Sequence, residues 1–206
     1  MRILIADDHS IVRRGIKDIL RDEFPFAEIT EVGDAEALML KILRESWDIV
    51  ISDLSMPGRT ALDVLPEIRQ QAPDLPVLIL SIYPEEQYAI RVLKAGAAGY
   101  LNKDLAPEEL INAVRRVLSG RKYITPSVAE KLADFSDEPK PAHEQLSNRE
   151  FEVMKLIAAG KSVSEIGSLF RLSATTISTY RARILKKMQM KTNAELIQYA
   201  IAYQLI

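Results

Sequence analysis

The sequence predicts an α/β domain followed by a smaller all-α domain. Over the first 120 residues, short apolar segments alternate with helical patterns. A polar segment with two prolines then interrupts this alternation, and every later segment has a helical pattern. The 206 residues suffice for two domains that each bury a core.

Five short segments are expected to be strands, the second of them with only a weak pattern, and each is followed by a helical pattern. The expected strands are 3–6, 29–32, 49–52, 77–80 and 98–101, and the expected helices are 11–20, 35–44, 62–71, 85–94 and 108–118. Apolar strands of this length, joined by helices, are typical of a parallel sheet that is covered on both faces. We therefore expect a doubly wound parallel sheet with right-handed crossover connections.

A sixth helix and a linker are expected next. Thr125 can cap a helix that begins with Pro126 and ends near residue 133, because proline is favoured at the first helical position. Residues 134–145, DFSDEPKPAHEQ, lack apolar periodicity, which indicates an interdomain linker with a solvated His143. The expected domains are 1–120, a connecting helix and linker over 121–145, and 146–206.

Helix-start signals divide residues 146–206 into four helices. Three capping boxes pair a hydroxyl with a glutamate three residues later: Ser147 with Glu150, Ser162 with Glu165, and Thr192 with Glu195. Ser173 can cap the third helix, expected over 174–188. The core of this domain is expected to contain Leu169, Leu172, Ile177, Ile184 and Met188.

The charge of the chain is unevenly distributed. The net charge is −2, but residues 146–206 carry nine basic and four acidic side chains, against 18 basic and 25 acidic before them. A basic C-terminal domain suits a polyanion such as DNA. The absence of cysteine excludes disulfides and thiolate chemistry, disfavours most zinc sites, and fits a reducing cytoplasm. No apolar run is long enough to span a membrane.

Acidic residues stand at the ends of two predicted strands. Asp7 and Asp8 follow the first strand, and Asp53 follows the third. Because ligands of an open parallel sheet bind at the carboxyl ends of its strands, we expect these three carboxylates to converge. Their repulsion calls for a hard divalent cation such as Mg²⁺, which would also shield an incoming phosphoryl group. Asp53 could then attack phosphorus and form an acyl phosphate.

Two more strand ends fit a phosphate site. The hydroxyl of Ser81, after the fourth strand, can donate to a phosphoryl oxygen, and the ammonium of Lys103, after the fifth, can pair with it. Each residue alone could be an ordinary loop residue, but their combination favours function. His9 is expected to be a local hydrogen-bonding residue rather than a metal ligand.

Residues 1–120 resemble a response-regulator receiver domain. The matching motifs are Asp7-Asp8-His9, Asp53-Leu54-Ser55-Met56-Pro57-Gly58, Ser81 and Tyr100–Lys103. The resemblance implies a flavodoxin-like strand order of 2-1-3-4-5 and phosphorylation of Asp53 by a histidine kinase. It also implies that Asp7, Asp8, Asp53 and the carbonyl of Ser55 hold Mg²⁺. Ser81 and Tyr100 correspond to the switch pair, and Lys103 to the phosphate-contacting lysine.

Residues 146–206 resemble the LuxR-type helix-turn-helix of NarL/FixJ-class regulators. The matching residues include Leu146-Ser147-x-Arg149-Glu150, Ala159-Gly160-Lys161-Ser162 and Thr176-Ile177-Ser178. The helix from residue 174 would then enter the major groove of DNA. The expected DNA contacts are Thr175, Thr176, Ser178, Thr179, Arg181, Ala182, Arg183, Lys186 and Lys187. The expected dimer contacts on the last helix are Leu196, Ile197, Ala200 and Ile201.

These resemblances imply a non-enzymatic regulator of transcription that binds promoter DNA as a dimer. Two alternatives remain. One is a DNA-binding regulator that does not depend on phosphorylation. The other is a phosphohydrolase with Asp53 as nucleophile, which would need a second carboxylate where Ser55 stands. A nucleotide-binding Rossmann domain is disfavoured, because the first strand is followed by Asp-Asp-His and not by a glycine-rich turn.

Overall fold

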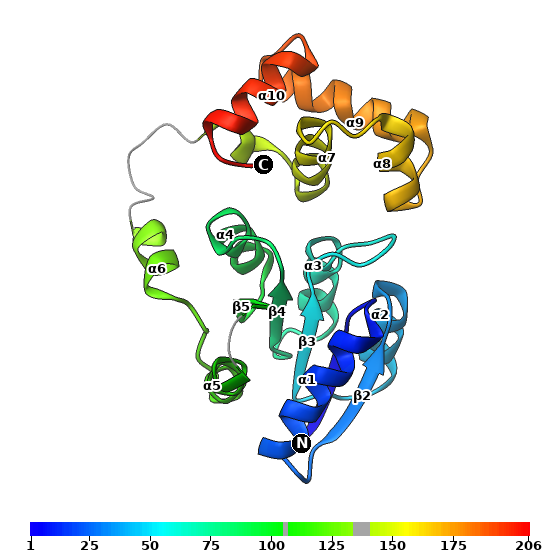
Figure 1. Cartoon of the computed structure of the whole chain (residues 1–206). Coiled ribbons are helices and arrows are strands. Elements are labelled where there is room, and N and C mark those ends of the chain that lie inside the picture. Colours follow the sequence, from blue (N-terminus) through cyan, green and yellow to red (C-terminus); the bar gives the residue numbers. More distant parts are fainter. Residues whose placement is uncertain (105–106, 134–140) are drawn as a thin grey trace. The chain divides into compact units, whose positions relative to one another are not determined.

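The computed structural model describes residues 1–104, 107–133 and 141–206 (Figure 1). The chain divides into two compact units, Met1–Phe135 and Ser136–Ile206. Most of the predicted linker, residues 134–140, lies outside the described residues. The domain boundaries expected at residues 120 and 146 stay a prediction.

The first unit contains a five-stranded parallel sheet in the order β2-β1-β3-β4-β5. The strands are β1 (Arg2–Ala6), β2 (Glu28–Val32), β3 (Ile49–Asp53), β4 (Val77–Ser81) and β5 (Gly99–Asn102). The register sets Ala6 opposite Ser52 and Ser81 opposite Asn102. The predicted fold class and strand order are therefore confirmed, and the carboxyl ends of β1, β3, β4 and β5 lie along one edge.

Helices cover both faces of the sheet (Figure 1). They are α1 (Ser10–Glu23), α2 (Ala35–Arg44), α3 (Ala61–Gln71), α4 (Glu85–Ala95) and α5 (Pro107–Leu118). Alternate strand residues such as Ile3 and Ile5 share a buried cluster with Ile16 and Leu20 of α1 and with α5. The residues between them, such as Leu4, are equally buried, because helices α2, α3 and α4 pack on the other side. Burial on both faces explains why β1, β3 and β4 are predominantly apolar, whereas the edge strand β2 is only partly buried and contains Glu28 and Glu31.

Helix α6 (Pro126–Ala133) begins at the predicted proline and packs on α4. The Thr125 hydroxyl donates to Glu85 Oε1 at the start of α4 at 2.7 Å. Val128 is buried. These contacts place α6 with the first compact unit. The end of the predicted linker is not irregular, because Ala142–Gln145 form a short 3₁₀ helix, η1.

The second unit consists of α7 (Asn148–Ala158), α8 (Val163–Phe170), α9 (Ala174–Lys187) and α10 (Asn193–Ala202). The capping boxes of Ser147 and Ser162 and the cap by Ser173 are confirmed. The third box differs: Thr192 accepts from the Glu195 N–H, but the Glu195 carboxylate accepts from the N–H of Lys191. Among the expected core residues, the prediction for Leu169 is wrong, because this residue of α8 is 53% exposed.

Gly167 allows α8 to approach the turn that leads into α9. A Cβ atom at this position would lie 2.7 Å from the carbonyl oxygen of Leu172. The N–H of Leu172 donates to the Gly167 carbonyl at 2.8 Å. A glycine inside this helix therefore sets the helix-turn-helix geometry, a role that was not among the predictions from the sequence. An isolated glycine within a helical pattern was the available signal.

Across the described parts of the chain, none of the helices combines the length and apolar character that crossing a bilayer requires.

Candidate functional site

The three predicted carboxylates converge at the carboxyl edge of the sheet. Asp7 follows β1 and Asp53 is the last residue of β3, the neighbouring strand. One ligand atom from each of Asp7, Asp8, His9 and Asp53 lies within 4.8 Å of the others. Asp7 and Asp53 are buried, whereas Asp8 is partly exposed. Ser55, whose carbonyl is a predicted ligand, lies two residues after Asp53 in the loop that leads to α3.

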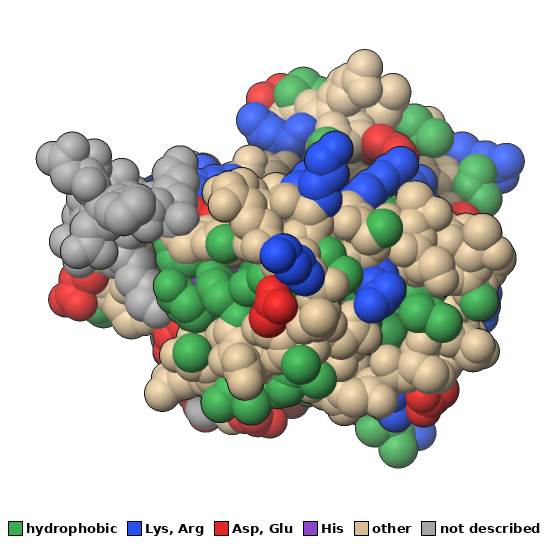
Figure 2. All heavy atoms as spheres, turned by 90° about the horizontal axis from the view of Figure 1, so that it is seen from above, with side chains coloured by type: hydrophobic (Ala, Val, Ile, Leu, Met, Phe, Trp, Pro, Cys, Tyr) green, Lys and Arg blue, Asp and Glu red, His purple; other side chains and the backbone are tan. Residues whose placement is uncertain are grey.

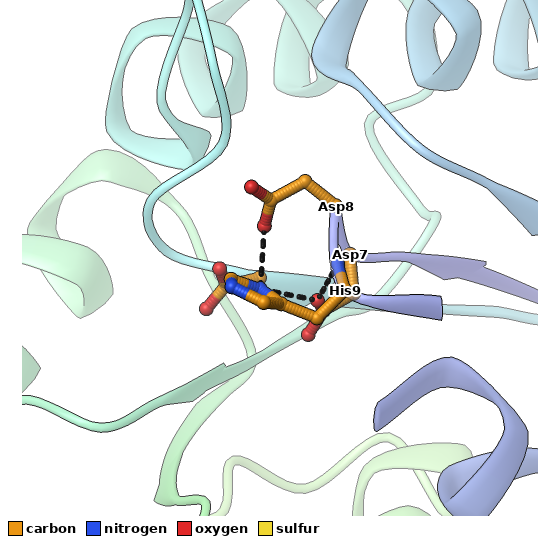
Figure 3. A group of neighbouring side chains, drawn as sticks. Asp7, Asp8 and His9 are labelled. Carbon is orange, nitrogen blue, oxygen red and sulfur yellow. Dashed lines mark hydrogen bonds and ion pairs between the residues drawn. The ribbon is translucent and has the colours of Figure 1, made fainter. Parts of the chain in front are cut away.

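His9 lies against this cluster (Figure 3). Its backbone N–H donates to Asp7 Oδ1 at 2.7 Å, and its Nδ1 lies 2.9 Å from Asp8 Oδ1. Asp8 Oδ1 is itself buried and receives no hydrogen bond within the described structure. The imidazole is largely exposed. His9 therefore contacts Asp7 through its backbone N–H and Asp8 through its imidazole, and its expected role as a local hydrogen-bonding residue rather than a metal ligand stays a prediction.

Lys103 extends from the end of β5 into the cluster. Its Nζ lies 2.6 Å from Asp7 Oδ2 and 2.9 Å from Asp53 Oδ1. Burial acts to lower the pKa of this lysine, but its pairing with the two carboxylates outweighs that effect, and the pKa is raised. Lys103 is therefore a fixed cation that bridges the predicted phosphate acceptor and a predicted metal ligand.

Asp53 is an unusually basic carboxylate. Burial raises its pKa from 3.8 to about 6, the charge of Asp7 adds to this effect, and Lys103 opposes it. At pH 7 Asp53 is still ionised, so the cluster holds three carboxylates against one ammonium. The remaining charge of −2 in a buried setting suits a divalent cation with oxygen ligands.

Ser81 and Tyr100 lie beside the cluster on β4 and β5. Both are buried, and the Ser81 Oγ accepts from the N–H of Tyr83 at 3.1 Å. The Tyr100 hydroxyl donates to the Tyr83 carbonyl at 2.7 Å. Burial raises the pKa of the Tyr100 phenol, and a hydrogen bond with Ser81 lowers it to a smaller extent. The structure thus brings the two predicted switch residues into contact, with both of them holding the segment after β4.

A second candidate surface lies on α9. The exposed residues Thr175, Thr179, Ala182 and Lys186 recur at helical spacing and share one face, with Ser178 and Arg183 exposed beside them. Thr176 is half-buried, and its hydroxyl bonds that of Ser173 at 2.8 Å. On the side that carries α9 and α10, Lys and Arg side chains lie at several separate places (Figure 2).

Two of the predicted DNA-contacting cations already have partners within their own unit. Arg181 Nε donates to Asn193 Oδ1 at 2.7 Å, which ties α9 to the start of α10. Lys187 Nζ donates to Glu150 Oε2 at 2.6 Å, which ties α9 to α7. Arg183 and Lys186 are therefore the cations of α9 that are most open to a ligand.

The predicted dimer contacts on α10 need correction. Leu196 and Ala200 are fully buried in the core of their own unit, so their side chains are not exposed to a second copy. Ile201 is 61% exposed and Ile197 is half-buried. Leu196 and Ala200 are therefore on the face of α10 that packs within its own unit, and Ile201 is at the solvent-exposed edge of that face.

His143 is not simply solvated, as the sequence had suggested. Its Nδ1 lies 2.8 Å from the Tyr199 hydroxyl, and its ring contacts those of Phe151 and Tyr203. The 3₁₀ helix η1 is thereby attached to α7 and α10. The sequence signal was a pair of tyrosines four residues apart, Tyr199 on α10 and Tyr203 directly after it.

Two family models match the chain. The response regulator receiver domain matches residues 3–115, and the bacterial regulatory proteins of the luxR family match residues 144–200. The first match contains the acidic cluster, Ser81 and Lys103, and the second contains α7 to α9.

Relatives match over the whole length. The chain is 34% identical to the response regulator UvrY of Escherichia coli, over 100% of this chain and 95% of UvrY. It is 32% identical to the response regulator GacA of Pseudomonas aeruginosa, over 100% and 98% of the two chains. A solved structure of RcsB from Salmonella enterica serovar Typhimurium, bound to promoter rprA in the presence of phosphomimetic BeF₃⁻, is 27% identical. The match covers 97% of this chain and 97% of the RcsB chain, with a TM-score of 0.68. The chain is therefore a member of the response regulator family, with a receiver domain followed by a luxR-family regulatory domain.

Proposed function

We propose that this chain takes a phosphoryl group onto Asp53 from a histidine kinase and, once phosphorylated, binds promoter DNA as a dimer to regulate transcription. The observation that supports the receiver half is the convergence of Asp7, Asp8, Asp53 and Lys103 at one edge of the sheet. The exposed face of α9 in a luxR-family domain supports the DNA half. Because its target is DNA, we place the protein in the bacterial cytoplasm.

The chemical step is a phosphoryl transfer between two side chains. An oxygen of the ionised Asp53 carboxylate forms a bond to phosphorus, and the bond from phosphorus to the imidazole nitrogen of the kinase breaks. The leaving nitrogen keeps the electron pair, and the product on Asp53 is an acyl phosphate. Lys103 pairs with Asp53 at 2.9 Å before transfer and can pair with a phosphoryl oxygen after it. Ser55 provides no carboxylate acid or base, which favours a single phosphorylation over repeated turnover.

The residues present fit a bound Mg²⁺. Asp7, Asp8 and Asp53 would hold it, with the carbonyl of Ser55 as a further ligand. The buried Asp8 Oδ1, which has no hydrogen bond among the described residues and only the largely exposed His9 imidazole close to it, is the observation that favours a cation there. When bound, the ion supplies positive charge that offsets the charge of the carboxylates and of the phosphoryl group.

Ser81 and Tyr100 are the proposed link between the phosphate and the surface. A phosphoryl group on Asp53 offers acceptors to the Ser81 hydroxyl, which would then release the Tyr83 N–H and its contact with Tyr100. The segment after β4 and the helix α4 would repack, which shifts the population towards the form that binds DNA. This shift could proceed either by release of α9, the helix expected to enter the major groove, or by dimerisation.

The test combines phosphorylation with DNA binding. Wild-type protein is incubated with a small phosphodonor and Mg²⁺, and its mass is measured. Its affinity is then measured for DNA duplexes that were selected from a random pool. We expect one added phosphoryl group and tighter DNA binding. Asp53→Ala should show neither, and Asp74→Asn, at the opposite end of the strands, should show both. Equal affinities of wild type and Asp53→Ala would exclude control by phosphorylation and leave a phosphorylation-independent regulator. Repeated turnover of phosphate esters would instead favour the phosphohydrolase.

A further inference from the structure

The turn of the helix-turn-helix contains an arginine in an unfavourable backbone conformation. Arg171 follows α8 with φ 55° and ψ 40°, which is the left-handed region. This conformation is energetically unfavourable for L-residues with a Cβ atom, so glycine or asparagine usually occupies this position after a helix. Its N–H is used in the turn, because it donates to the Ser168 carbonyl at 3.3 Å.

Among the described residues of the second unit, no contact of the Arg171 guanidinium offsets this cost. Arg171 is exposed, and in the described residues its guanidinium has no ion pair and no hydrogen bond. The other arginines of the turn region differ: Arg149 pairs with Glu152 and stacks over Phe170, and Arg181 is held by Asn193. The guanidinium of Arg171 therefore contributes little to the folding of this unit.

The position of Arg171 in the chain suits a contact with the DNA backbone. Arg171 lies two residues before Ser173, the residue that caps α9, so it enters the turn directly ahead of the exposed α9 face. A helix that lies in the major groove has a sugar-phosphate backbone on either side of it, and residues flanking the helix reach that backbone. The expected DNA contacts all lie at helical spacing along α9 and therefore do not include a residue in the turn.

We propose that Arg171 is a DNA-positioning residue: its guanidinium binds a backbone phosphate beside the start of α9. This inference rests on the proposed DNA binding and adds a contact that α9 itself does not supply. A phosphate contact contributes affinity and salt dependence but no base preference. The left-handed turn is thus maintained at a cost to stability because it directs a charge to the ligand.

Substitution of Arg171 by glycine separates the effect of the strained backbone on stability from the effect of the guanidinium on DNA affinity. Arg171→Gly should relieve the backbone strain, so amides of α8 and α9 should exchange with solvent about threefold to fivefold more slowly. The same variant should bind selected DNA about fivefold to tenfold more weakly at low salt, by a similar factor for different sequences. The slope of log affinity against log salt concentration should fall in magnitude by about 1.

Two further variants control the comparison. Arg171→Gln keeps a long side chain in the strained turn, so it should lose the same affinity without the gain in protection. Gln189→Gly relieves a similar conformation, φ 57° at the end of α9, without a change of charge, so it should gain protection and keep wild-type affinity.

The outcomes distinguish the inference from the proposed function. If wild-type protein binds DNA and both Arg171 variants keep its affinity and salt slope, Arg171 is not a phosphate contact, and this inference alone is overturned. If wild-type protein binds no selected DNA in either phosphorylation state, the proposed function fails, and this inference fails with it.

Discussion

The raised pKa of Asp53 predicts that the receiver domain is destabilised by its own phosphate acceptor at neutral pH. Burial raises this pKa from 3.8 to about 6, so the folded state binds a proton at Asp53 more tightly than the unfolded state does. Stability therefore falls as pH rises through the interval between these values and stays lower above pH 6. Asp53→Asn replaces the carboxylate by a neutral side chain of similar size and should remove this penalty.

The free-energy cost of the ionised Asp53 follows from the difference between its pKa values in the folded and unfolded states. At 1.36 kcal/mol per pKa unit, a fully ionised Asp53 costs about 3 kcal/mol in the folded receiver. At pH 4.5, where the folded-state carboxyl is protonated, the cost is about 1 kcal/mol. The advantage of Asp53→Asn over wild type should thus grow by about 2 kcal/mol between pH 4.5 and 8. Lys103 keeps its 2.6 Å contact with Asp7 in the variant, so no buried ammonium is left unpaired.

Urea unfolding followed by tryptophan fluorescence measures this difference in the full chain. Trp47 is the single tryptophan, it is buried, and its Nε1 donates to the Lys41 carbonyl at 3.1 Å, so its signal reports on the receiver. Mg²⁺ is chelated throughout, and Asp74→Asn serves as a control that removes an exposed carboxylate. An advantage of Asp53→Asn that is absent at pH 8, or that is the same at pH 4.5 and 8, would refute the reasoning.

Three further predictions concern the cation site, its lysine and the turn. Millimolar MgCl₂ should raise the urea midpoint of the receiver at pH 8, by less in Asp8→Asn and by less below pH 6, where Asp53 is protonated; equal midpoint shifts in wild type and variant would exclude Asp8 as a ligand. Lys103→Gln should lower the free energy of unfolding at pH 8 by about 3 kcal/mol, because it leaves buried carboxylates without their cation; a loss below about 1 kcal/mol would mean that the pair is screened like a surface pair. Gly167→Ala should destabilise the C-terminal unit, because the added methyl clashes with a backbone carbonyl at 2.7 Å, and this strain of about 1–3 kcal/mol exceeds a gain in helix propensity of about 1 kcal/mol. Gly15→Ala, with no atom within 4 Å of the added Cβ, should show the gain alone in thermal unfolding, and equal gains at both glycines would contradict the clash.

Local signals in the sequence predicted the elements closely. Strands β1, β3 and β4 are buried on both faces and therefore predominantly apolar, so they are recognisable as short runs bounded by polar residues, whereas the partly exposed edge strand β2 has a weaker pattern. Ser147, Ser162 and Ser173 each cap a helix as predicted, because a cap satisfies backbone groups within the same few residues. The third box shows the limit of this logic, since Glu195 can reach either of two neighbouring N–H groups and bonds that of Lys191.

The candidate receiver site was also predictable, for a topological reason. In a parallel sheet all strands end at the same edge, so residues at the ends of separate strands must approach each other. That rule predicts from the sequence alone that Asp7, Asp53, Ser81 and Lys103 lie close together. It did not reveal that Lys103 bridges Asp7 and Asp53.

The sequence alone thus determined the order of elements, the strand ends that form the acidic cluster and the basic character of the C-terminal domain. Only the tertiary structure decided which cations of α9 are engaged by Asn193 and Glu150, which side of α10 is buried, and how His143 contacts Tyr199. The physical reason is the range of the interactions. Caps, strand patterns and strand ends depend on neighbours along the chain or on a general rule of topology. Side-chain pairing between helices depends on packing angles and distances that no local pattern encodes.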